Sequence, residues 1–287
     1  MFFYVNNSPF AGKEGKYLTT RHINERLQKE ILRNVSLQVL NTDRTDVFEV
    51  LGRGELQMAI LIETMRREGY EFMVSRPEVI TIEKDNQIHE PVENVYIDIP
   101  DEYVGTVTKN LSSRKGKMTS LMNNGFGRAT LEFEIPSRGL IGFRNQFLTE
   151  TRGSGIMNTL FDSYKSWFGD IPQRTSGVLV ADRDGKVTTY ASLAMVDRGI
   201  LFVPPGTMVY KGMIVGERNN DGDLVVNITK EKKLTNHRAS GSDDTVPLRP
   251  PQLMSLDQCL EFISDDEFVE VTPETIRLRK SDLNVKT

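Results

Sequence analysis

The chain has 287 residues and a formal net charge of -4 at pH 7, a length that suits two or three domains. The acidic balance excludes a uniformly basic nucleic-acid binder, so any contact with a polyanion must come from local basic patches. Cys259 is the single cysteine, which excludes an internal disulfide framework and every multi-cysteine metal site and is compatible with a reducing compartment.

The first segment, residues 1–84, opens with a strand of aromatic and β-branched residues. Thr19 or Thr20 can cap the helix that follows. Gly52-Arg53-Gly54 precedes a second helix, which Gly69 ends. The expected strands are Phe2–Val5, 35–40, 48–50 and 70–75, and the expected helices are 20–34 and 55–68. This sequence of elements is the split βαβ order of a ferredoxin-like domain.

The second segment, residues 85–170, repeats the same order of elements. Its apolar residues alternate in the strands and recur at helical spacing in the helices. The expected strands are 95–99, 118–122, 129–135 and 156–161, and the expected helices are 103–112 and 140–149. The repeated order predicts a second ferredoxin-like domain.

Charge is unevenly distributed in this second segment. No Asp or Glu occurs between Glu102 and Glu132, whereas five cations do. Arg138 and Arg144 extend the basic run to the second helix, whose start attracts phosphate through free amides and the helix dipole. We therefore predict a phosphate-contacting surface. Its candidate RNA-binding residues are Lys109, Arg114, Lys115, Lys117, Arg128, Arg138 and Arg144.

The third segment, residues 171–287, shows short apolar runs between glycine turns, which is typical of strands. One helix is expected after Ser255, which fits a capping box with Gln258. Cys259 falls near the buried face of that helix without a clustered His or acid, so we expect a small buried hydrophobe and not a nucleophile. Strands are expected at 178–181, 187–194, 208–210, 224–228, 268–271 and 276–278. The sequence thus predicts an α+β fold with two ferredoxin-like domains and a β-rich C-terminal domain containing one helix.

A basic loop, NITKEKKLTNHRASG, spans residues 227–241 and contains one acid, Glu231. Its composition suits a solvated loop. Composition alone favours that interpretation, but a phosphate-binding surface is the alternative, because Lys and Arg neutralise backbone charge while polar side chains donate hydrogen bonds. The candidate RNA-binding residues here are Lys230, Lys232, Lys233, Asn236, Arg238 and Ser240.

No catalytic set is visible in the sequence. His22, His89 and His237 fall in three different segments, and no metal-binding or Ser-His-acid spacing occurs. Residues 12–16 read GKEGK, but the spacing of a phosphate loop fails on both sides of this motif. No window approaches the roughly 18 apolar residues of a membrane helix, so we expect a cytoplasmic protein with no membrane partner.

Two stretches resemble known translation factors. GRGELQMAILIETMRREGYEFMVSRPEVI resembles the third domain of ribosomal translocation GTPases of the elongation factor G class. GRATLEFEIPSRGLIGFRNQFLTETRGSG resembles their fifth domain, and its SRGLIGFRNQF is similar to the form found in the BipA family, also called TypA. KKLTNHRASG matches the characteristic C-terminal loop of that family.

The resemblance implies a ribosome-binding C-terminal half of a translational GTPase. It would contact large-subunit rRNA and A-site tRNA through its basic loops and act in ribosome assembly and stress-dependent translation. Neither a Walker loop nor the Asn-Lys-x-Asp motif occurs, so we expect Met1 to be a fragment start and this chain not to be an enzyme. We expect no cofactor in it, with GTP and Mg²⁺ held by a missing N-terminal GTPase domain, which would be a further partner.

Two alternatives to RNA binding remain open. The chain could be a protein-interaction or structural module whose basic loops are merely solvated. It could also be a metabolic enzyme with twin ferredoxin-like domains, which a pocket with clustered acids would favour. Arg53 is similarly open: the resemblance suggests an interdomain or ribosome-facing residue, whereas a turn arginine often pairs with a nearby carboxylate.

Overall fold

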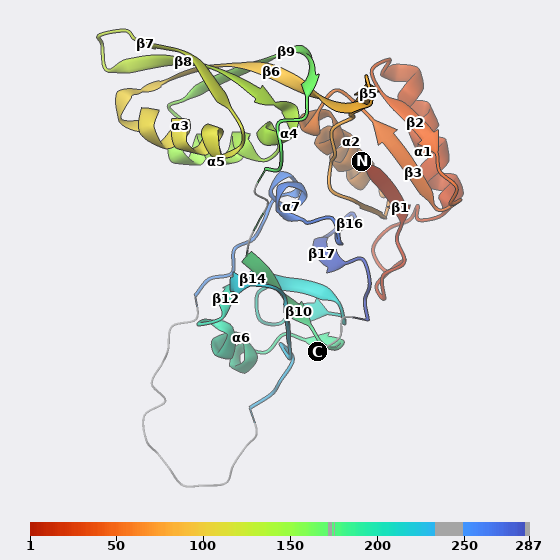
Figure 1. Ribbon diagram of the computed structural model, residues 1–287. Coiled ribbons are helices and arrows are strands. Elements are labelled where there is room, and N and C mark those ends of the chain that lie inside the picture. The colour runs from red at the N-terminus through yellow and green to blue at the C-terminus, as the bar shows by residue number, and fades with distance from the viewer. Residues whose placement is uncertain (172–173, 175, 233–248, 285–287) are drawn as a thin grey trace, which may run out of the picture. The chain divides into compact units, whose positions relative to one another are not determined.

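The computed structural model describes residues 1–171, 174, 176–232 and 249–284 (Figure 1). The chain forms two compact units. The first combines Met1–Arg76 with Arg174–Thr287, and the second is Pro77–Gln173. Helices and strands are mixed in both units, which confirms the predicted α+β class. The three-domain division at residues 84/85 and 170/171 stays a prediction.

The N-terminal part of the first unit contains the predicted split βαβ elements. Thr19 caps α1 by accepting a hydrogen bond from the His22 amide, and Ile23 and Leu27 form the buried stripe of that helix. The strands are antiparallel in the order β4-β1-β3-β2. The elements are β1 (Phe2–Val5), α1 (Thr20–Arg33), β2 (Gln38–Asn41), β3 (Val47–Leu51), α2 (Glu55–Arg67) and β4 (Phe72–Val74).

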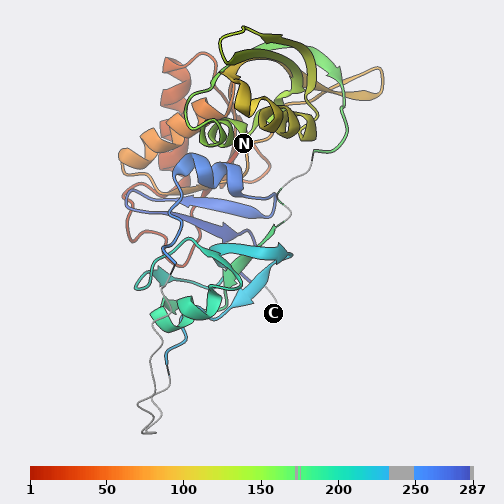
Figure 2. The same ribbon diagram turned by 90° about the vertical axis from the view of Figure 1, so that its left-hand side faces the viewer.

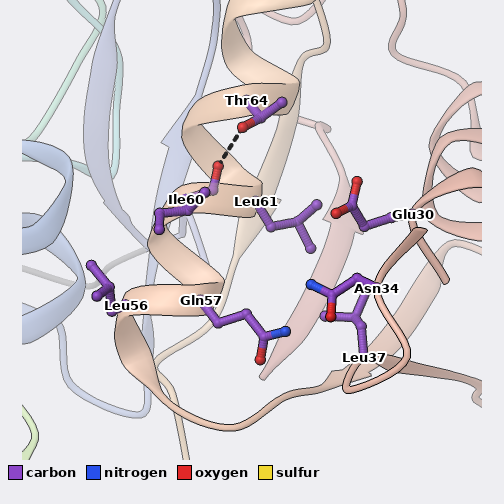
Figure 3. A pocket seen from close by; sticks show the side chains of 8 residues that line it. All are labelled: Glu30, Asn34, Leu37, Leu56, Gln57, Ile60, Leu61 and Thr64. Atoms are coloured by element: carbon purple, nitrogen blue, oxygen red, sulfur yellow. Dashed lines mark hydrogen bonds between the residues drawn. The ribbon is translucent and has the colours of Figure 1, made fainter.

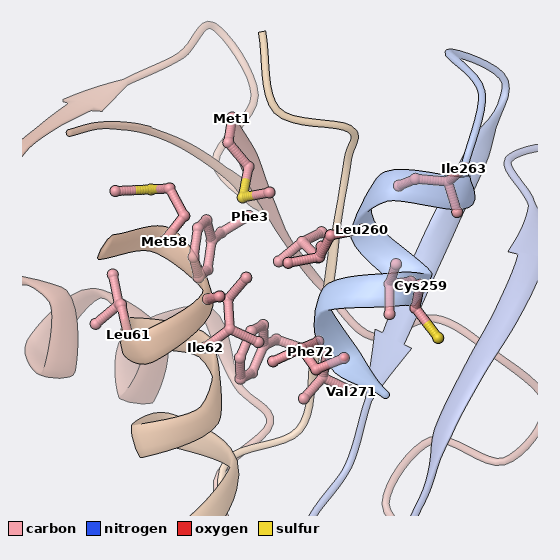
Figure 4. Close-up of a cluster of buried hydrophobic side chains, with 14 of the residues drawn as sticks. Met1, Phe3, Met58, Leu61, Ile62, Phe72, Cys259, Leu260, Ile263 and Val271 are labelled. Carbon is pink, nitrogen blue, oxygen red and sulfur yellow. The ribbon is translucent and has the colours of Figure 1, made fainter. Parts of the chain in front are cut away.

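The C-terminal part of this unit extends the same sheet. β16 pairs with β4, with Val269 opposite Val74 and Val271 opposite Phe72, and the sheet reaches ten strands. The blue strands β16 and β17 lie between the N-terminal elements and the cyan strands of this unit (Figure 2). A single core spans both parts, in which Leu260 and Cys259 of α7 share one hydrophobic cluster with Phe3 (Figure 4). The elements are β10 (Ser176–Ala181), β11 (Gly185–Lys186), α6 (Thr189–Met195), β12 (Gly199–Leu201), β13 (Met208–Val209), β14 (Met213–Asp221), β15 (Leu224–Val226), α7 (Leu256–Phe262), β16 (Glu267–Val271) and β17 (Ile276–Lys280).

One C-terminal prediction was wrong and two were confirmed. The apolar run at 187–194 was expected as a strand, but most of it forms helix α6, because Thr188 caps the helix by accepting from the Ala191 amide. The described part of the third segment thus contains two helices and not one. The capping box of Ser255 and Gln258 is present. Cys259 is buried, and burial raises the pKa of its thiol to about 12.

The second unit repeats the ferredoxin-like order, with strands β9-β6-β8-β7 and with β5 paired to the start of β6. Helices α3 and α5 cover one face of the sheet. The helix predicted at 140–149 is divided: α4 ends at Leu140 with Ile141 as its C-cap, and Gly142, with a φ of 72°, is the N-cap of α5. The elements are β5 (Ile82–Lys84), β6 (Gln87–Pro100), α3 (Val104–Ser113), β7 (Lys117–Asn123), β8 (Arg128–Pro136), α4 (Ser137–Leu140), α5 (Phe143–Glu150) and β9 (Ile156–Ser166). No helix in the described ranges is long and apolar enough to cross a membrane.

Candidate nucleic-acid interface

The cations predicted in the second unit fall into two groups, and the first group is tied into the fold. Arg138 forms an ion pair with Glu90, a fully buried carboxylate, through an Nε to Oε2 distance of 2.5 Å and an Nη2 to Oε1 distance of 3.0 Å. The Phe168 amide donates to the same carboxylate at 2.8 Å. Because Glu90 neutralises it, Arg138 supports the structure and contributes little free charge to a phosphate.

Arg114 connects the end of α3 to the junction of α4 and α5. Its guanidinium donates to the Gly139 and Ile141 carbonyls at 3.1 and 2.9 Å and to Gln146 Oε1 at 3.0 Å. Two of these three acceptors are backbone carbonyls. Arg114 therefore fixes the backbone between α4 and α5 relative to the end of α3.

Arg128 lies on the face of the sheet that the helices leave open. Its side chain lies 2.5 Å from Asp98 Oδ1. Lys165 on the same face lies 2.6 Å from Glu134 Oε2, and this hydrogen bond raises the pKa of Lys165. These pairs leave the open face mixed in charge, so it is not the basic surface that the sequence indicates.

The second group of cations is exposed. Among the described residues, no hydrogen bond or ion pair engages the side chains of Lys109, Lys115, Lys117 and Arg144. We call these four residues the α3–β7 patch. Asn110 donates to Glu150 at 2.6 Å, and this bond, with the Arg114 contact to Gln146, sets α3 beside α5. Arg144 at the start of α5 therefore lies on the same side as the α3–β7 turn.

The backbone of the α3–β7 turn determines where its lysines lie. Lys115 has a φ of 67°, and the Gly116 amide donates to the Leu111 carbonyl at 2.8 Å, which ends the helix. A Cβ on residue 116 would lie 2.8 Å from that carbonyl oxygen, so the tight turn requires glycine. Lys115 precedes Gly116 and Lys117 follows it, and both lysines are exposed.

The basic loop at residues 227–241 is described as far as Lys232. Lys230 and Lys232 are exposed, and the Lys230 carbonyl accepts a 2.5 Å hydrogen bond from Thr188 Oγ1 at the start of α6. This bond holds the N-terminal part of the loop against the start of α6. Four of the predicted residues, Lys233, Asn236, Arg238 and Ser240, lie outside the described residues.

Arg53 is exposed at the start of α2, and its amide donates to Gln57 Oε1 at 2.7 Å. Its side chain makes no ion pair in the part of the chain that the structure describes. The pairing expected of a turn arginine is therefore not observed there, and the interdomain or ribosome-facing role stays a prediction.

The glycine-rich segment at residues 12–16 does not fit a nucleotide. The amides of Gly12 and Gly15 donate to the two oxygens of the Glu71 carboxylate, each at 2.9 Å. Glu71 is fully buried. The amides that could hold a phosphate are thus occupied by an anion of the chain itself, and no step of a GTP reaction is assigned to these residues.

A pocket of about 280 Å³ lies between α1 and α2 (Figure 3). Glu30 is its one acidic residue, and the pocket contains no imidazole or thiol. The described residues form no group of three or more His, Cys, Asp or Glu that could hold a metal ion. Nothing in this pocket favours the alternative of a metabolic enzyme. The lining residues are Glu30, Asn34, Leu37, Leu56, Gln57, Ile60, Leu61 and Thr64.

Sequence reasoning missed one side chain near the basic surface. Trp167 is 42% exposed just after β9, and Arg138 lies over its ring with the Cζ atom 3.7 Å from the ring centroid. The sequence offered one signal for it: the only tryptophan of the chain lies beside charged and small residues in the stretch YKSWFGD. Its pairing with Arg138 spans 29 positions and could not be read from local patterns.

The chain is similar to known proteins along almost its whole length. Residues 87–175 match the family model of the elongation factor G C-terminus, and residues 176–285 match that of the TypA/BipA C-terminal domain. Proteins named large ribosomal subunit assembly factor BipA from Bacillus subtilis and Synechocystis are 53% and 50% identical over 285 and 280 residues. The relative of that name from Salmonella typhimurium is 50% identical over 284 residues.

These alignments cover 98–99% of the chain and 47% of each of these relatives. The chain thus spans about half the length of the curated relatives that it matches.

Proposed function

The chain belongs to the TypA/BipA family, and from this premise we propose that it binds the large ribosomal subunit during assembly, with the α3–β7 patch contacting rRNA. Its relatives are named large ribosomal subunit assembly factors. Such a role would place the protein in the cytoplasm.

One observation carries this proposal: the fold separates cations that pair with a carboxylate from cations that do not. Arg138 and Arg128 are neutralised by Glu90 and Asp98. The four cations of the patch are exposed and have no partner among the described residues. Surface charge of this kind supplies the sequence-independent part of binding to a nucleic-acid backbone.

We further propose that GTP and Mg²⁺ act in the portion of the family protein that this chain does not span. The residues of this chain would then bind and orient, without carrying out the reaction. The occupied amides of Gly12 and Gly15 support this division, because they already donate to the Glu71 carboxylate and are not available to a phosphate.

Co-sedimentation of the full 287-residue chain with purified large subunits tests the patch. We expect the combined variant Lys109→Ala, Lys115→Ala, Lys117→Ala and Arg144→Ala to bind more weakly. The slope of log K against log salt should fall by about 3, because four phosphate contacts are removed.

A matched control removes four exposed lysines elsewhere: Lys29→Ala, Lys84→Ala, Lys186→Ala and Lys211→Ala. It changes the net charge by the same amount, so it should weaken binding less and leave the slope almost unchanged. If the two variants bind alike, the patch makes no specific contact, and the alternative of a protein-interaction module with solvated lysines gains support.

The basic loop at residues 227–241 is proposed as a second RNA contact, directed at A-site tRNA, and Arg53 as an interdomain or ribosome-facing residue. A role in stress-dependent translation belongs to the same proposal. Combined replacement of Lys232, Lys233 and Arg238 by alanine should reduce binding to ribosomes that carry an A-site tRNA. An equal reduction on ribosomes without that tRNA would contradict the tRNA assignment.

A further inference from the structure

Trp167 is a fixed aromatic surface beside the α3–β7 patch. It is the single tryptophan of the chain and remains 42% exposed. Its amide donates to the Ile88 carbonyl at 3.0 Å, which holds the backbone at the end of the sheet. An exposed indole whose backbone is fixed offers a flat apolar surface at low entropic cost.

Arg138 supports this indole from one side. Its guanidinium lies over the ring at 3.7 Å and is itself held by the buried Glu90. The Phe168 amide donates to Glu90 as well, so the residue after the tryptophan is anchored to the same carboxylate. With one face of the indole covered, its exposed area belongs to the opposite face and the edge.

A lysine of the patch approaches the same place. Gly169 has a φ of 86°, and a Cβ added to it would lie 3.8 Å from Lys115 Nζ. The Gly169 carbonyl accepts a hydrogen bond from Arg138 Nη2. Gly169 thus lies next to both the exposed ammonium group of Lys115 and the guanidinium that supports Trp167.

We propose that Trp167 stacks on an unpaired nucleobase of RNA while Lys115 neutralises a neighbouring phosphate. This inference rests on the proposed function of the α3–β7 patch. Single-stranded nucleic acid is bound by this combination of a cation for the backbone and an aromatic face for the base. Every base has a flat face, so the subsite accepts any unpaired base, and its specificity is for unpaired nucleotides over duplex.

The fluorescence of Trp167 tests the stacking directly, because no other tryptophan contributes to the signal. An unstructured ten-nucleotide oligoribonucleotide should quench the fluorescence of the full chain on binding. An oligonucleotide of the same length with abasic positions should bind about tenfold more weakly and quench little. Equal binding and quenching by the two would overturn the proposal.

Variants separate the base contact from the phosphate contact. Measured by anisotropy of a labelled oligonucleotide, Trp167→Ala should weaken binding about tenfold and Trp167→Phe should restore most of it, because phenylalanine still stacks. Lys115→Ala should retain quenching at saturation but reduce the salt dependence. Unchanged affinity of Trp167→Ala would contradict stacking. Were that variant to unfold, the quenching by intact and abasic oligonucleotides would still decide.

Failure of this inference is distinguishable from failure of the proposed function. If Trp167→Ala binds the oligonucleotide as well as the unaltered chain does, while the four-residue patch variant loses co-sedimentation with large subunits, the patch binds rRNA without stacking. If the patch variant retains co-sedimentation, the proposed function fails, whatever the fluorescence shows.

Discussion

The two ferredoxin-like sheets of this chain have the same element order and end differently at one edge. In the first unit, the edge strand β4 pairs with β16, so the sheet continues into the C-terminal part. In the second unit, β9 pairs with β6, and no strand in the described ranges pairs with its outer edge. An identical supersecondary order can therefore serve as a scaffold in one unit and as a surface in the other.

The charged groups of the two units differ in the same way. Glu270 of the first unit is fully buried and accepts hydrogen bonds from Ser8 at 2.7 Å, Tyr210 at 2.5 Å and Arg277 at 3.2 Å. Asn6 donates to it at 3.1 Å. The bonds from Asn6 and Ser8 join residues that are 264 and 262 positions apart in sequence. In the second unit, the patch cations face solvent.

Removal of the Glu270 carboxylate should have the largest effect. Glu270→Ala leaves Arg277 and Tyr210 buried without this partner, so we expect the unfolding free energy of the first unit to fall by about 3–5 kcal/mol. Urea unfolding can follow each unit separately. Labelling of Cys259, whose thiol pKa burial raises to about 12, reports the first unit. The fluorescence of Trp167 reports the second unit.

The expected outcome is that Cys259 labels at lower urea in the variant while the fluorescence midpoint changes much less. Glu25→Ala is the matched control, because Glu25 is an exposed glutamate paired with the exposed Arg21 on α1. It should leave both midpoints unchanged. Equal shifts of both probes in Glu270→Ala would show that the network stabilises the whole chain and not the first unit alone.

Arg138→Ala should have the largest effect within the second unit. It leaves the buried Glu90 with the Phe168 amide as its remaining described donor. The Arg138 side chain is 15% exposed, so in the variant water can replace part of its interaction with Glu90. We therefore expect the unfolding free energy of the second unit to fall by about 2–3 kcal/mol. The fluorescence midpoint in urea should decrease, with little change in Cys259 labelling.

Arg128→Ala is the control for a surface pair in the same unit. Arg128 and Asp98 are 37% and 40% exposed, so their pair should contribute less than about 1 kcal/mol. If Arg128→Ala destabilises the unit as much as Arg138→Ala does, burial does not explain which cations are structural.

Local patterns in the sequence predicted most elements of both sheets because caps and periodicity act over a few residues. Thr19 and the Ser255–Gln258 box are examples. Helix α6 was missed because an apolar run at 187–194 suits a buried strand as well as a short helix, and the Thr188 cap decides between them. The local capping signal of Thr188 therefore outweighed the apolar pattern there.

The sequence identified which cations belong to the candidate site, but not which of them pair with carboxylates in the fold. The acid-free run identified the cations around α3, yet the partners of Arg138 and Arg128 lie 48 and 30 residues away. Only the folded sheet shows that Glu90 and Asp98 neutralise them. The run of charge in the sequence therefore overstates the free charge on the surface, and Lys109, Lys115, Lys117 and Arg144 are what remains.

The smallest effect concerns the hydroxyl of Tyr210 in the buried network. Tyr210→Phe removes its hydrogen bond to Glu270, so at pH 8 we expect a loss of about 1 kcal/mol in unfolding free energy. Burial, together with the Glu270 charge, raises the pKa of Tyr210 well above its ordinary value of 10. Its contribution is thus fully present below about pH 10 and is lost as pH rises toward the folded-state pKa.

Urea unfolding of the unaltered chain and of Tyr210→Phe from pH 8 to pH 11 measures the contribution of the hydroxyl. Unfolding is followed by Cys259 labelling at pH 8 and by circular dichroism throughout. The difference in unfolding free energy between the two proteins should be constant up to about pH 10 and shrink above it, because the tyrosine of the unfolded chain ionises first. Tyr190→Phe, at an exposed tyrosine of α6, should not change the free energy at pH 8. A difference that grows above pH 10 would mean that Tyr210 is ionised in the fold, and the described hydrogen bond from its hydroxyl to Glu270 could not exist.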